Sequence, residues 1–349
     1  MKTPWGYADF DAHEALHFVT DEPSGLRAII AMHSTHLGPA AGGTRFWHYG
    51  DDADALTDAL RLSRGMSYKN AMAGLPLGGG KAVVLAGADR AKSPELLAAF
   101  GRAVDRLGGN YVTAEDVGMS VADMIAVRKQ TKFVAGLPAE GGEVGGDPGP
   151  HTSLGVFLGI KAAVRSALGK DKLAGLHIAL QGAGSVAGGV ARLAAAEGAR
   201  LSIADVDQGR VQRLAGETGA EIVSPEAIMS LEADVLSPCA LGAILTEASI
   251  AALNTPIVAG GANNQLAGPG DGQRLAARGI LYAPDYVINA GGIINVSTEY
   301  VGDGDAALVR SRIEAIPDRL EAIWATSADT GRDPAAVADA MAQKLIGRG

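Results

Sequence analysis

Uninterrupted apolar runs alternate along the chain with segments in which apolar residues recur at helical spacing. The runs Leu26–Ala31 and Ala82–Leu85 are typical of buried strands. Over Pro94–Leu107, leucine, phenylalanine and valine share one helical face, proline lies in the first turn, and Gly108 and Gly109 follow the last turn. The pattern predicts alternating helices and strands, which is typical of an α/β fold.

Two more helices and one strand are expected in the first half. One helical pattern starts after Asp54 and ends near Met66, and another runs from Ser120 to Arg128. A short strand is predicted within Tyr111–Met119, and acidic residues and a glycine follow it directly. Carboxylates are therefore expected at a strand end, where functional groups are often found.

The second half contains a strand, a glycine turn, a helix and a strand in direct succession. A helix over Thr152–Leu168 precedes the strand Leu176–Leu180, which runs into Gly-x-Gly-x-x-Ala at residues 182–187. The next strand, Arg200–Ala204, ends on Asp205, twenty-three residues after the first glycine of the motif. This order is the fingerprint of a dinucleotide-binding domain and predicts a Rossmann-type, doubly wound sheet.

Shorter elements follow, and then a helical C-terminal region. Short strands and helices are predicted over Asp234–Pro238, Cys239–Ala243, Pro256–Gly260 and Ile280–Gly292. From about residue 305 to 345 the pattern is helical. In a doubly wound sheet these elements put the ligand at the carboxyl ends of the strands.

Glycine and proline are dense over residues 132–150, which predicts a domain hinge. We expect an N-terminal α/β substrate domain over residues 1–140 and an NAD-binding domain over 141–324. A C-terminal helix over 325–349 is expected to return to the first domain.

Composition narrows the class of protein. The 349 residues are 47% hydrophobic and 20% charged, with a net charge of −9, which argues against nucleic acid or an anionic membrane as partner. A single cysteine excludes an intrachain disulfide and fits a reducing compartment. The N-terminus has no signal-peptide core, and no apolar run reaches the ~18 residues of a membrane span, so we expect a cytoplasmic protein.

The candidate chemistry centres on Lys69 and Lys81, which stand twelve positions apart with Gly78–Gly80 between them. If both ammonium groups face one cleft, each makes the other harder to charge, so one can act as a base while the other holds a carboxylate. The glycines would let a substrate approach the backbone. The alternative is that both lysines are solvated surface charges.

Glu115 and Asp116 are candidates to pair with a lysine or move a proton. One alternative is that Asp116 caps the helix that follows. We favour Asp116 as the proton shuttle because of the lysines.

Each residue of the glycine motif has an expected role in binding a dinucleotide. Gly182 allows the tight turn, Gly184 lets the pyrophosphate reach the helix N-terminus, and Ala187 keeps the helix close to its strand. Asp205 would bind the ribose hydroxyls. Because the first basic residue after it is Arg210, NAD is expected in preference to NADP.

Other reactive residues are assigned no chemistry. Cys239 has no adjacent base and is expected to be a small packed residue. His13 and His17 stand four apart without a suitable partner, so no metal is expected.

Several stretches together resemble one enzyme family. From about residue 20 to 300 the chain is similar to the leucine, phenylalanine and valine dehydrogenases of the glutamate dehydrogenase superfamily, and most closely to the leucine enzymes. The stretches that carry the resemblance are Gly38–Arg45, Tyr68–Ala71, Leu75–Lys81, Thr113–Gly118, Pro238–Ala243 and Tyr282–Gly292. It implies reversible, NAD-dependent deamination of an apolar L-amino acid to a 2-oxo acid and ammonia, by a homo-oligomer.

The resemblance also implies residue roles. Lys69 would bind the substrate carboxylate, Lys81 would be the catalytic base and Asp116 the proton-transfer acid. Further substrate-binding positions would be Gly42, Gly43, Asn264 and Asn289. The cofactor would be bound by Gly182, Ala183, Gly184, Ser185, Val186, Asp205, Cys239, Ala240, Asn264 and Thr152, the last of these at the nicotinamide carboxamide.

By the same resemblance the substrate side chain would contact an apolar pocket, which excludes glutamate. Its members would be Ala41, Met66, Ala114, Ile293 and Val296. Ala41 departs from the leucine enzymes, which usually have Leu there, so phenylalanine or another aromatic substrate stays open. His151 also departs from the family, and no role is predicted for it. The remaining alternatives are a non-catalytic NAD-binding relative and another two-domain hydride-transfer enzyme.

Overall fold

The structure is a computed structural model that describes residues 3–137, 147–302 and 305–348. Contacts between Cα atoms divide the chain into two compact units, which are unit 1 (Met1–Gly146, Val296–Ala306 and Ala342–Gly349) and unit 2 (Asp147–Asn295 and Ala307–Met341). The expected boundary between residues 140 and 141, within the predicted hinge, lies outside the described residues. The functional domain limits therefore stay a prediction.

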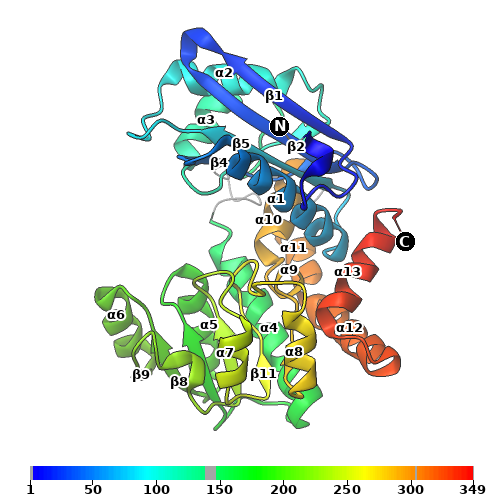
Figure 1. Ribbon diagram of the computed structural model, residues 1–349. Helices are drawn as coiled ribbons and strands as arrows, with labels where there is room; N and C mark the ends of the chain where they lie inside the picture. Colours follow the sequence, from blue (N-terminus) through cyan, green and yellow to red (C-terminus); the bar gives the residue numbers. More distant parts are fainter. Residues whose placement is uncertain (1–2, 138–146, 303–304, 349) are drawn as a thin grey trace. The chain divides into compact units, whose positions relative to one another are not determined.

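Unit 1 is built on a mixed sheet of six described strands (Figure 1). Its order is β1-β2-β5-β3-β6, and β4 also pairs with β5. β1 and β2 are antiparallel neighbours, as are β2 and β5, whereas β3 and β4 run parallel to β5. The strands are β1 (Ala15–Asp21), β2 (Leu26–Ser34), β3 (Ala40–Ala41), β4 (Thr44–Trp47), β5 (Gly78–Leu85) and β6 (Tyr111–Val112).

Helices cover both faces of this sheet, in line with its uninterrupted apolar strands. The helices are α1 (Asp52–Met72), α2 (Pro94–Asp105) and α3 (Val121–Arg128). Ile30 and Val84 pack in the cluster that contains the apolar residues of α2 and α3, whereas Ile29 and Val83 pack against α1. Side chains alternate along a strand, so Lys81, two residues before Val83, lies on the α1 face.

Two helix starts and four strands differ from the sequence prediction. α1 begins at Asp52, because Asp51 rather than Asp54 caps it by accepting a hydrogen bond from Ala53 N at 2.9 Å. It also runs beyond Met66 to Met72, since its last turns pack against β5. The helix expected from Thr152 begins three residues earlier, and β1, β3, β4 and β9 were not predicted at all.

The three glycines before Lys81 make room for the protein's own chain, whereas the sequence predicted room for a substrate. A Cβ on Gly79 would lie 2.0 Å from Ser67 N in α1, and one on Gly78 would lie 2.0 Å from Ser34 O. A Cβ on Gly80 would lie 2.8 Å from the Tyr111 ring. Gly79 thus allows α1 to pack directly on the backbone of β5, whereas Gly78 and Gly80 make room for Ser34 and for the Tyr111 ring.

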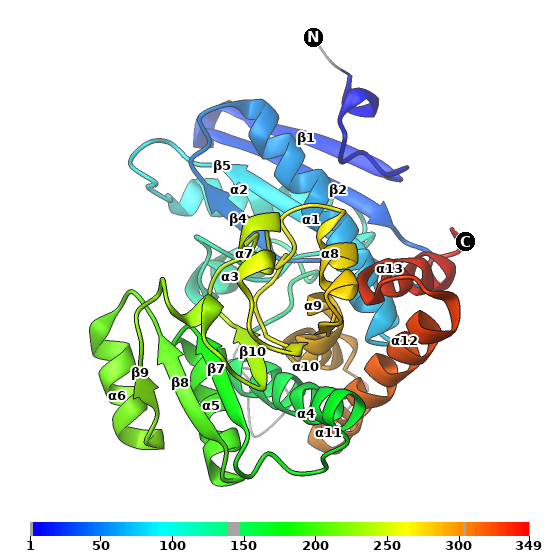
Figure 2. The same ribbon diagram turned by 60° about the horizontal axis from the view of Figure 1, so that its bottom comes forward.

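Unit 2 contains a parallel sheet of six described strands, and Figure 2 shows four of them side by side. The order β12-β11-β10-β7-β8-β9 means that the chain starts in the middle, moves out to β9 and then returns to β10. The expected doubly wound fold is therefore confirmed, with its switch point between β7 and β10. The strands are β7 (His177–Gln181), β8 (Arg200–Ala204), β9 (Glu221–Ile222), β10 (Val235–Pro238), β11 (Ile257–Val258) and β12 (Leu281–Tyr282).

The remaining helices connect these strands or follow them. Cys239–Ala243 forms a loop after β10, where Ala243 has a left-handed φ of 54°. None of the helices in the described ranges combines the length and apolar character needed to cross a membrane. The helices are α4 (Gly149–Leu168), α5 (Ser185–Ala196), α6 (Gln208–Thr218), α7 (Glu247–Ala252), α8 (Asp271–Ala277), α9 (Asp285–Ile288), α10 (Gly291–Val301), α11 (Ala306–Glu314), α12 (Ile316–Thr330) and α13 (Pro334–Leu345).

The close approach of α1 to β5 can be tested with two glycine substitutions. Gly79→Ala should lower the free energy of unfolding by ~1–3 kcal/mol, because its methyl group would overlap Ser67. The matched control is Gly65→Ala in α1, whose Cβ would meet no atom within 4 Å and should raise that free energy by ~0.5–1 kcal/mol. Urea denaturation measures both, and equal effects would contradict the packing argument.

Candidate active site

A buried ion pair joins β5 to the loop after β6. Lys81 is 5% exposed, and its Nζ lies 2.7 Å from Asp116 Oδ2. Burial lowers the pKa of Lys81, and the Asp116 carboxylate opposes that shift. Burial would raise the pKa of Asp116, but Lys81 and Arg45 hold it below its usual value. The pair therefore places a lysine whose pKa is lowered beside a carboxylate whose pKa is also lowered.

Arg45 on β4 extends this pair into a chain of charges. Its Nε lies 3.2 Å from Asp116 Oδ2, and its Nη1 lies 2.7 Å from Asp58 Oδ2. Tyr49 donates a hydrogen bond of 2.7 Å to the same Asp58 oxygen. We call Lys81, Asp116, Arg45, Asp58 and Tyr49 the charge relay. All five residues belong to unit 1.

Sequence reasoning missed three members of the relay. Arg45 is the last residue of Gly38–Arg45, one of the stretches that carry the family resemblance, and this position could have indicated a role for it. Asp58 and Tyr49 gave none, because only the packing of α1 brings them to Arg45. Besides burial, the positive charge of Arg45 lowers the pKa of Lys81, and the effect expected from Lys69 stays a prediction.

The alternative role for Asp116, as a helix cap, is wrong. Ser120 caps α3: its hydroxyl accepts from Asp123 N, and Asp123 accepts from Ser120 N at 2.8 Å in return. Asp116 therefore lies in the loop before the cap, where its carboxylate is directed to Lys81 and Arg45.

Lys69 lies in the last turn of α1, on the helix that covers the Lys81 face of the sheet. Its neighbour Asn70 donates to Gly78 O at 2.6 Å, which fixes the end of the helix to the start of β5. The structure thus places the helix that contains Lys69 on the sheet face of Lys81. The role of Lys69 stays a prediction.

Three of the expected pocket residues share one apolar cluster in unit 1. Ala41 is buried there, with Ala114 and Val296 packed beside it. Met66 Cγ would lie 3.1 Å from a Cβ on Gly42, so Met66 approaches the same loop. The other cluster members are Leu77, Val112, Ala135 and Tyr300. Ile293, expected in the same pocket, belongs to unit 2.

Gly42 and Gly43 hold their loop close to the ion pair. A Cβ on Gly42 would lie 1.8 Å from Gly80 O, and one on Gly43 would lie 2.9 Å from Asp116 Cβ. Any side chain at these positions would displace β5 or Asp116.

In unit 2 the glycine-rich loop has the backbone form that a pyrophosphate needs. Gly182 has a φ of +112°, and a Cβ there would lie 3.1 Å from Ala240 Cβ. Gly184 is the N-cap of α5, and it offers no side chain to the amides of the first turn. Those amides, Ser185 and Val186 among them, are suited to an anionic group. The residues therefore fit a dinucleotide.

Asp205, at the end of β8, holds this loop in place. Its Oδ2 accepts from Ala183 N at 2.7 Å, and its Oδ1 accepts from Asp207 N at 2.9 Å. Burial would raise the pKa of Asp205, but these backbone amides keep it below its usual value. The carboxylate is therefore ionised, as an acceptor of ribose hydroxyls must be.

The loop after β10 meets the glycine-rich loop at the switch point. Cys239 N donates to Gln181 O at 2.8 Å, and its Sγ accepts from Gly261 N at 3.4 Å. Burial raises the pKa of the Cys239 thiol, which supports a packed residue rather than a nucleophile.

The predicted asparagines and Thr152 lie in unit 2. Asn289 Nδ2 donates to Gly261 O at 3.1 Å, whereas its buried Oδ1 has no hydrogen-bond partner within the described ranges. Asn264 is exposed and has a left-handed φ of 52°. The Thr152 hydroxyl donates to Pro148 O at 3.0 Å.

His151 precedes Thr152 in α4. A Cβ on Gly291 would lie 2.0 Å from His151 O, so the backbone at this position packs tightly. Burial lowers the pKa of the His151 imidazole, and Asp147 opposes the shift. These contacts explain the backbone position but give the imidazole no role.

Two family models match the chain. One, described as Glu/Leu/Phe/Val dehydrogenase, dimerisation domain, matches residues 13–133. The other, described as Glutamate/Leucine/Phenylalanine/Valine dehydrogenase, matches residues 200–343.

Individual proteins are similar over nearly the whole chain. Leucine dehydrogenase of Bacillus subtilis is 46% identical over 338 residues, which cover 96% of this chain and 92% of the relative. Valine dehydrogenase of Streptomyces albus is 44% identical, covering 97% and 94%. The crystal structure of L-tryptophan dehydrogenase from Nostoc punctiforme matches with a TM-score of 0.85 and 42% identity, and covers 96% of each chain.

Proposed function

This chain belongs to the Glu/Leu/Phe/Val dehydrogenase family, and we propose from that membership that it oxidatively deaminates an apolar L-amino acid with NAD. Leucine, valine and isoleucine are the proposed substrates, the 2-oxo acid and ammonia the products, and the reaction is reversible. The observation that carries the proposal is the 2.7 Å contact between Lys81 Nζ and Asp116 Oδ2. Deamination needs a base and a proton carrier at one place.

Lys81 is the proposed base and Asp116 the proposed proton carrier. Loss of hydride from the substrate Cα leaves an iminium carbon, which water must attack. Neutral Lys81 takes a proton from that water. Burial favours the neutral form of the lysine because it lowers the pKa of its ammonium group. Asp116, in contact with Lys81, then accepts that proton from the Lys81 ammonium group and passes it to the departing nitrogen.

Lys69 is the proposed ligand of the substrate carboxylate. Its helix covers the sheet face on which Lys81 lies, and the bond from Asn70 to Gly78 O holds the helix end in place. The ammonium group attracts a carboxylate as a compact point charge. Gly42 and Gly43 are proposed to let the substrate approach the loop beside Asp116.

The apolar cluster around Ala41, Ala114 and Val296 is the proposed site of the substrate side chain, with Met66 and Ile293 as further members. Such a surface binds an aliphatic group and gives the carboxylate of glutamate no charged partner. Because Ala41 is small, an aromatic amino acid is the alternative substrate. The similarity to a tryptophan dehydrogenase supports that alternative.

The dinucleotide is proposed to bind unit 2 at the switch point, where it would supply the hydride acceptor. Gly182, Ala183, Gly184, Ser185 and Val186 are the proposed pyrophosphate residues, and Asp205 is the proposed ribose ligand. Val206 is 86% exposed and Leu241 is 64% exposed. These apolar side chains suit an adenine ring. Cys239 and Ala240, which directly precede Leu241, are further proposed cofactor residues.

Thr152 is the proposed ligand of the nicotinamide carboxamide and Asn264 a proposed cofactor ligand, while Asn289, with Asn264, is proposed to bind the substrate. The unpartnered Oδ1 of Asn289, buried among the described residues, supports a polar ligand there, because a buried acceptor is costly without a donor. An amide or ammonium group would provide that donor.

We further propose a cytoplasmic homo-oligomer that associates through unit 1. β1 is at the end of its sheet and Phe18 on it is 61% exposed, which supports association along this strand. The family description of residues 13–133 as a dimerisation domain supports the same proposal.

Substrate choice is tested by initial rates of NADH formation with L-leucine, L-valine, L-phenylalanine, L-tryptophan and L-glutamate. We expect the highest kcat/KM on leucine and valine, and a value at least ~100-fold lower on glutamate. A maximum on an aromatic amino acid would select the alternative substrate. No turnover on any amino acid, with dinucleotide still bound, would indicate a non-catalytic relative.

The base assignment is tested with Lys81→Ala. Turnover should fall by ~100-fold or more, since general base catalysis contributes that much, while NADH binding measured by fluorescence is retained. The matched control is Lys92→Ala, which breaks the ion pair of Lys92 with Asp123 in the same unit and should leave turnover nearly unchanged. Near-normal rates in the Lys81 variant would remove the base from the proposal.

The relay predicts opposite pH shifts for two variants. Deamination should rise with pH as Lys81 loses its proton. Asp58 raises the pKa of Lys81 and Arg45 lowers it. Asp58→Asn should therefore move the acid limb of the kcat/KM profile to lower pH, and Arg45→Gln should move it to higher pH. Shifts in the same direction would contradict the relay.

A further inference from the structure

The end of the chain, from Ala342 on, belongs to unit 1 and lies beside the end of β2 (Figure 2). Its main polar contact there is the guanidinium of Arg348, which is 21% exposed. Nη1 donates to Asp11 O at 2.6 Å, and Nη2 donates to Ala12 O at 2.9 Å and to His33 O at 2.6 Å. Three backbone carbonyls therefore fix the guanidinium in place.

The same guanidinium determines which nitrogen of His33 carries the proton. Arg348 Nη1 lies 2.8 Å from Nε2 of this completely buried imidazole. A guanidinium can only donate, so Nε2 accepts and carries no proton. The ring proton is therefore on Nδ1, which donates to Ser67 Oγ at 2.8 Å.

The surroundings of His33 keep its ring neutral. Burial, together with the positive charges of Arg348 and His13, lowers the pKa of His33 to about 4. The Asp11 carboxylate, with Oδ2 at 3.1 Å from Nε2, opposes that shift. The remaining ring neighbour is Tyr68, at 6.1 Å between ring centroids. At physiological pH the imidazole is thus neutral, and Nε2 stays an acceptor for the guanidinium.

Ser67 connects this imidazole to the region of both lysines. It lies two residues before Lys69 in α1 and is completely buried. A Cβ on Gly79 would lie 2.1 Å from Ser67 Oγ, so the hydroxyl packs on β5 two residues before Lys81. The distance between this turn of α1 and β5 therefore depends on where the hydroxyl is held. Because the hydroxyl is buried, it is no nucleophile for a substrate.

A second contact from the end of the chain holds the neighbouring residue. Gln343 Nε2 donates to Tyr68 OH at 3.0 Å, one residue before Lys69. Arg348 N donates to Gln343 O at 2.8 Å, so one turn at the end of the chain presents both side chains. Asn70, on the other side of Lys69, binds the start of β5. The backbone is therefore held on both sides of Lys69.

We propose that Arg348 is a positioning residue for the substrate carboxylate, and that it acts through His33 and Ser67 on the turn of α1 that contains the proposed carboxylate ligand. The inference rests on the proposed function, because that ligand is Lys69. Without the guanidinium, the ring proton can move to Nε2 and be donated to Asp11. The bond that holds Ser67 then loses its donor. An ammonium group on a flexible stem reaches a carboxylate only from a fixed backbone position.

Binding of isocaproate, which is leucine without its amino group, tests the proposal without turnover. The full-length enzyme is loaded with NADH, and NADH fluorescence reports the binding. Lys69→Gln should weaken isocaproate by ~10-fold or more, because the carboxylate loses a charged partner. Arg348→Gln should weaken it by ~5-fold or more and change NADH affinity by less than about twofold. Arg348→Lys, which keeps a charged donor, should recover part of the loss.

A double-mutant cycle tests the route. Ser67→Ala keeps the packing on Gly79 and removes only the hydroxyl, so it should weaken isocaproate about as much as Arg348→Gln. No effect of Ser67→Ala would overturn the route through His33. In the Lys69→Gln background, Arg348→Gln should cause no further loss, since the group that it positions is absent. Additive losses would indicate a general effect on stability and would overturn the proposal.

The matched control is Arg278→Gln. Arg278 also donates to two backbone carbonyls, those of Ile250 and Leu253, but it belongs to unit 2. This variant should leave isocaproate binding unchanged. An equal loss in Arg278→Gln would attribute the effect to stability rather than to the position of Lys69, and would overturn the inference.

The same titrations separate this inference from the proposed function. Isocaproate binding that weakens in Lys69→Gln but not in Arg348→Gln would overturn only the positioning role. No weakening in Lys69→Gln would overturn the proposed carboxylate site, and no binding to the unchanged protein would overturn the proposed aliphatic substrate. Either result would overturn the inference as well. A loss in both variants, with NADH still bound, would support both proposals.

Discussion

The buried Lys81–Asp116 pair is the constraint on which the rest of unit 1 depends. An ammonium group that is 5% exposed must have a partner, because an unpaired charge in that position would cost several kcal/mol. Asp116 can reach it only because Gly43 lets the loop after β6 approach. Arg45, on the strand beside β5, then shares Asp116 and ties it to α1 through Asp58. The charge relay is thus also a structural link between sheet and helix.

Close backbone packing gives this link its shape. Without a side chain at Gly79, α1 lies directly on β5, and the last turn that contains Lys69 is fixed beside the strand that contains Lys81. Apolar side chains of the same strands point alternately to the two faces of the sheet, and each face packs in its own apolar cluster. Residues proposed for binding and for proton transfer are therefore placed by backbone contacts rather than by long side chains.

Local patterns in the sequence predicted much of the fold. The strand Arg200–Ala204 and the glycine turn were found because strand period, turn chemistry and the terminal acid are all local. The family resemblance, confirmed by the comparisons, rests on several short stretches in order. By contrast, β1 is a partly exposed edge strand with no buried residue, and the longer α1 is stabilised by packing on β5, which no local pattern reports. The contacts of Asp58 and Tyr49 with Arg45 likewise depend on the packing of α1. The contact of Ser67 with the backbone of Gly79 also follows only from the fold.

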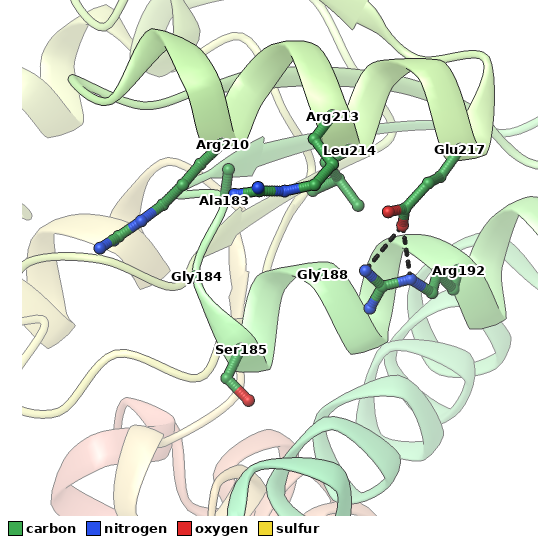
Figure 3. A pocket seen from close by; sticks show the side chains of 9 residues that line it. All are labelled: Ala183, Gly184, Ser185, Gly188, Arg192, Arg210, Arg213, Leu214 and Glu217. Carbon is green, nitrogen blue, oxygen red and sulfur yellow. Dashed lines mark hydrogen bonds and ion pairs between the residues drawn. The ribbon is translucent and has the colours of Figure 1, made fainter.

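The two sets of charges follow one physical rule with opposite results. In the relay of unit 1 the Arg45 charge is compensated by Asp58 and Asp116, and its remaining effect is to lower the pKa of Lys81. In unit 2, Arg192 is compensated by Glu217 (Figure 3), whereas Arg213, on the helix beside the glycine-rich loop, has no ion pair within the described ranges. A compensated cation shifts the pKa of its neighbours, whereas the charge of an uncompensated cation stays available to an anion. Since the relay belongs to unit 1 and the glycine-rich loop to unit 2, the residues proposed for proton transfer and those proposed for the cofactor are held by separate contacts.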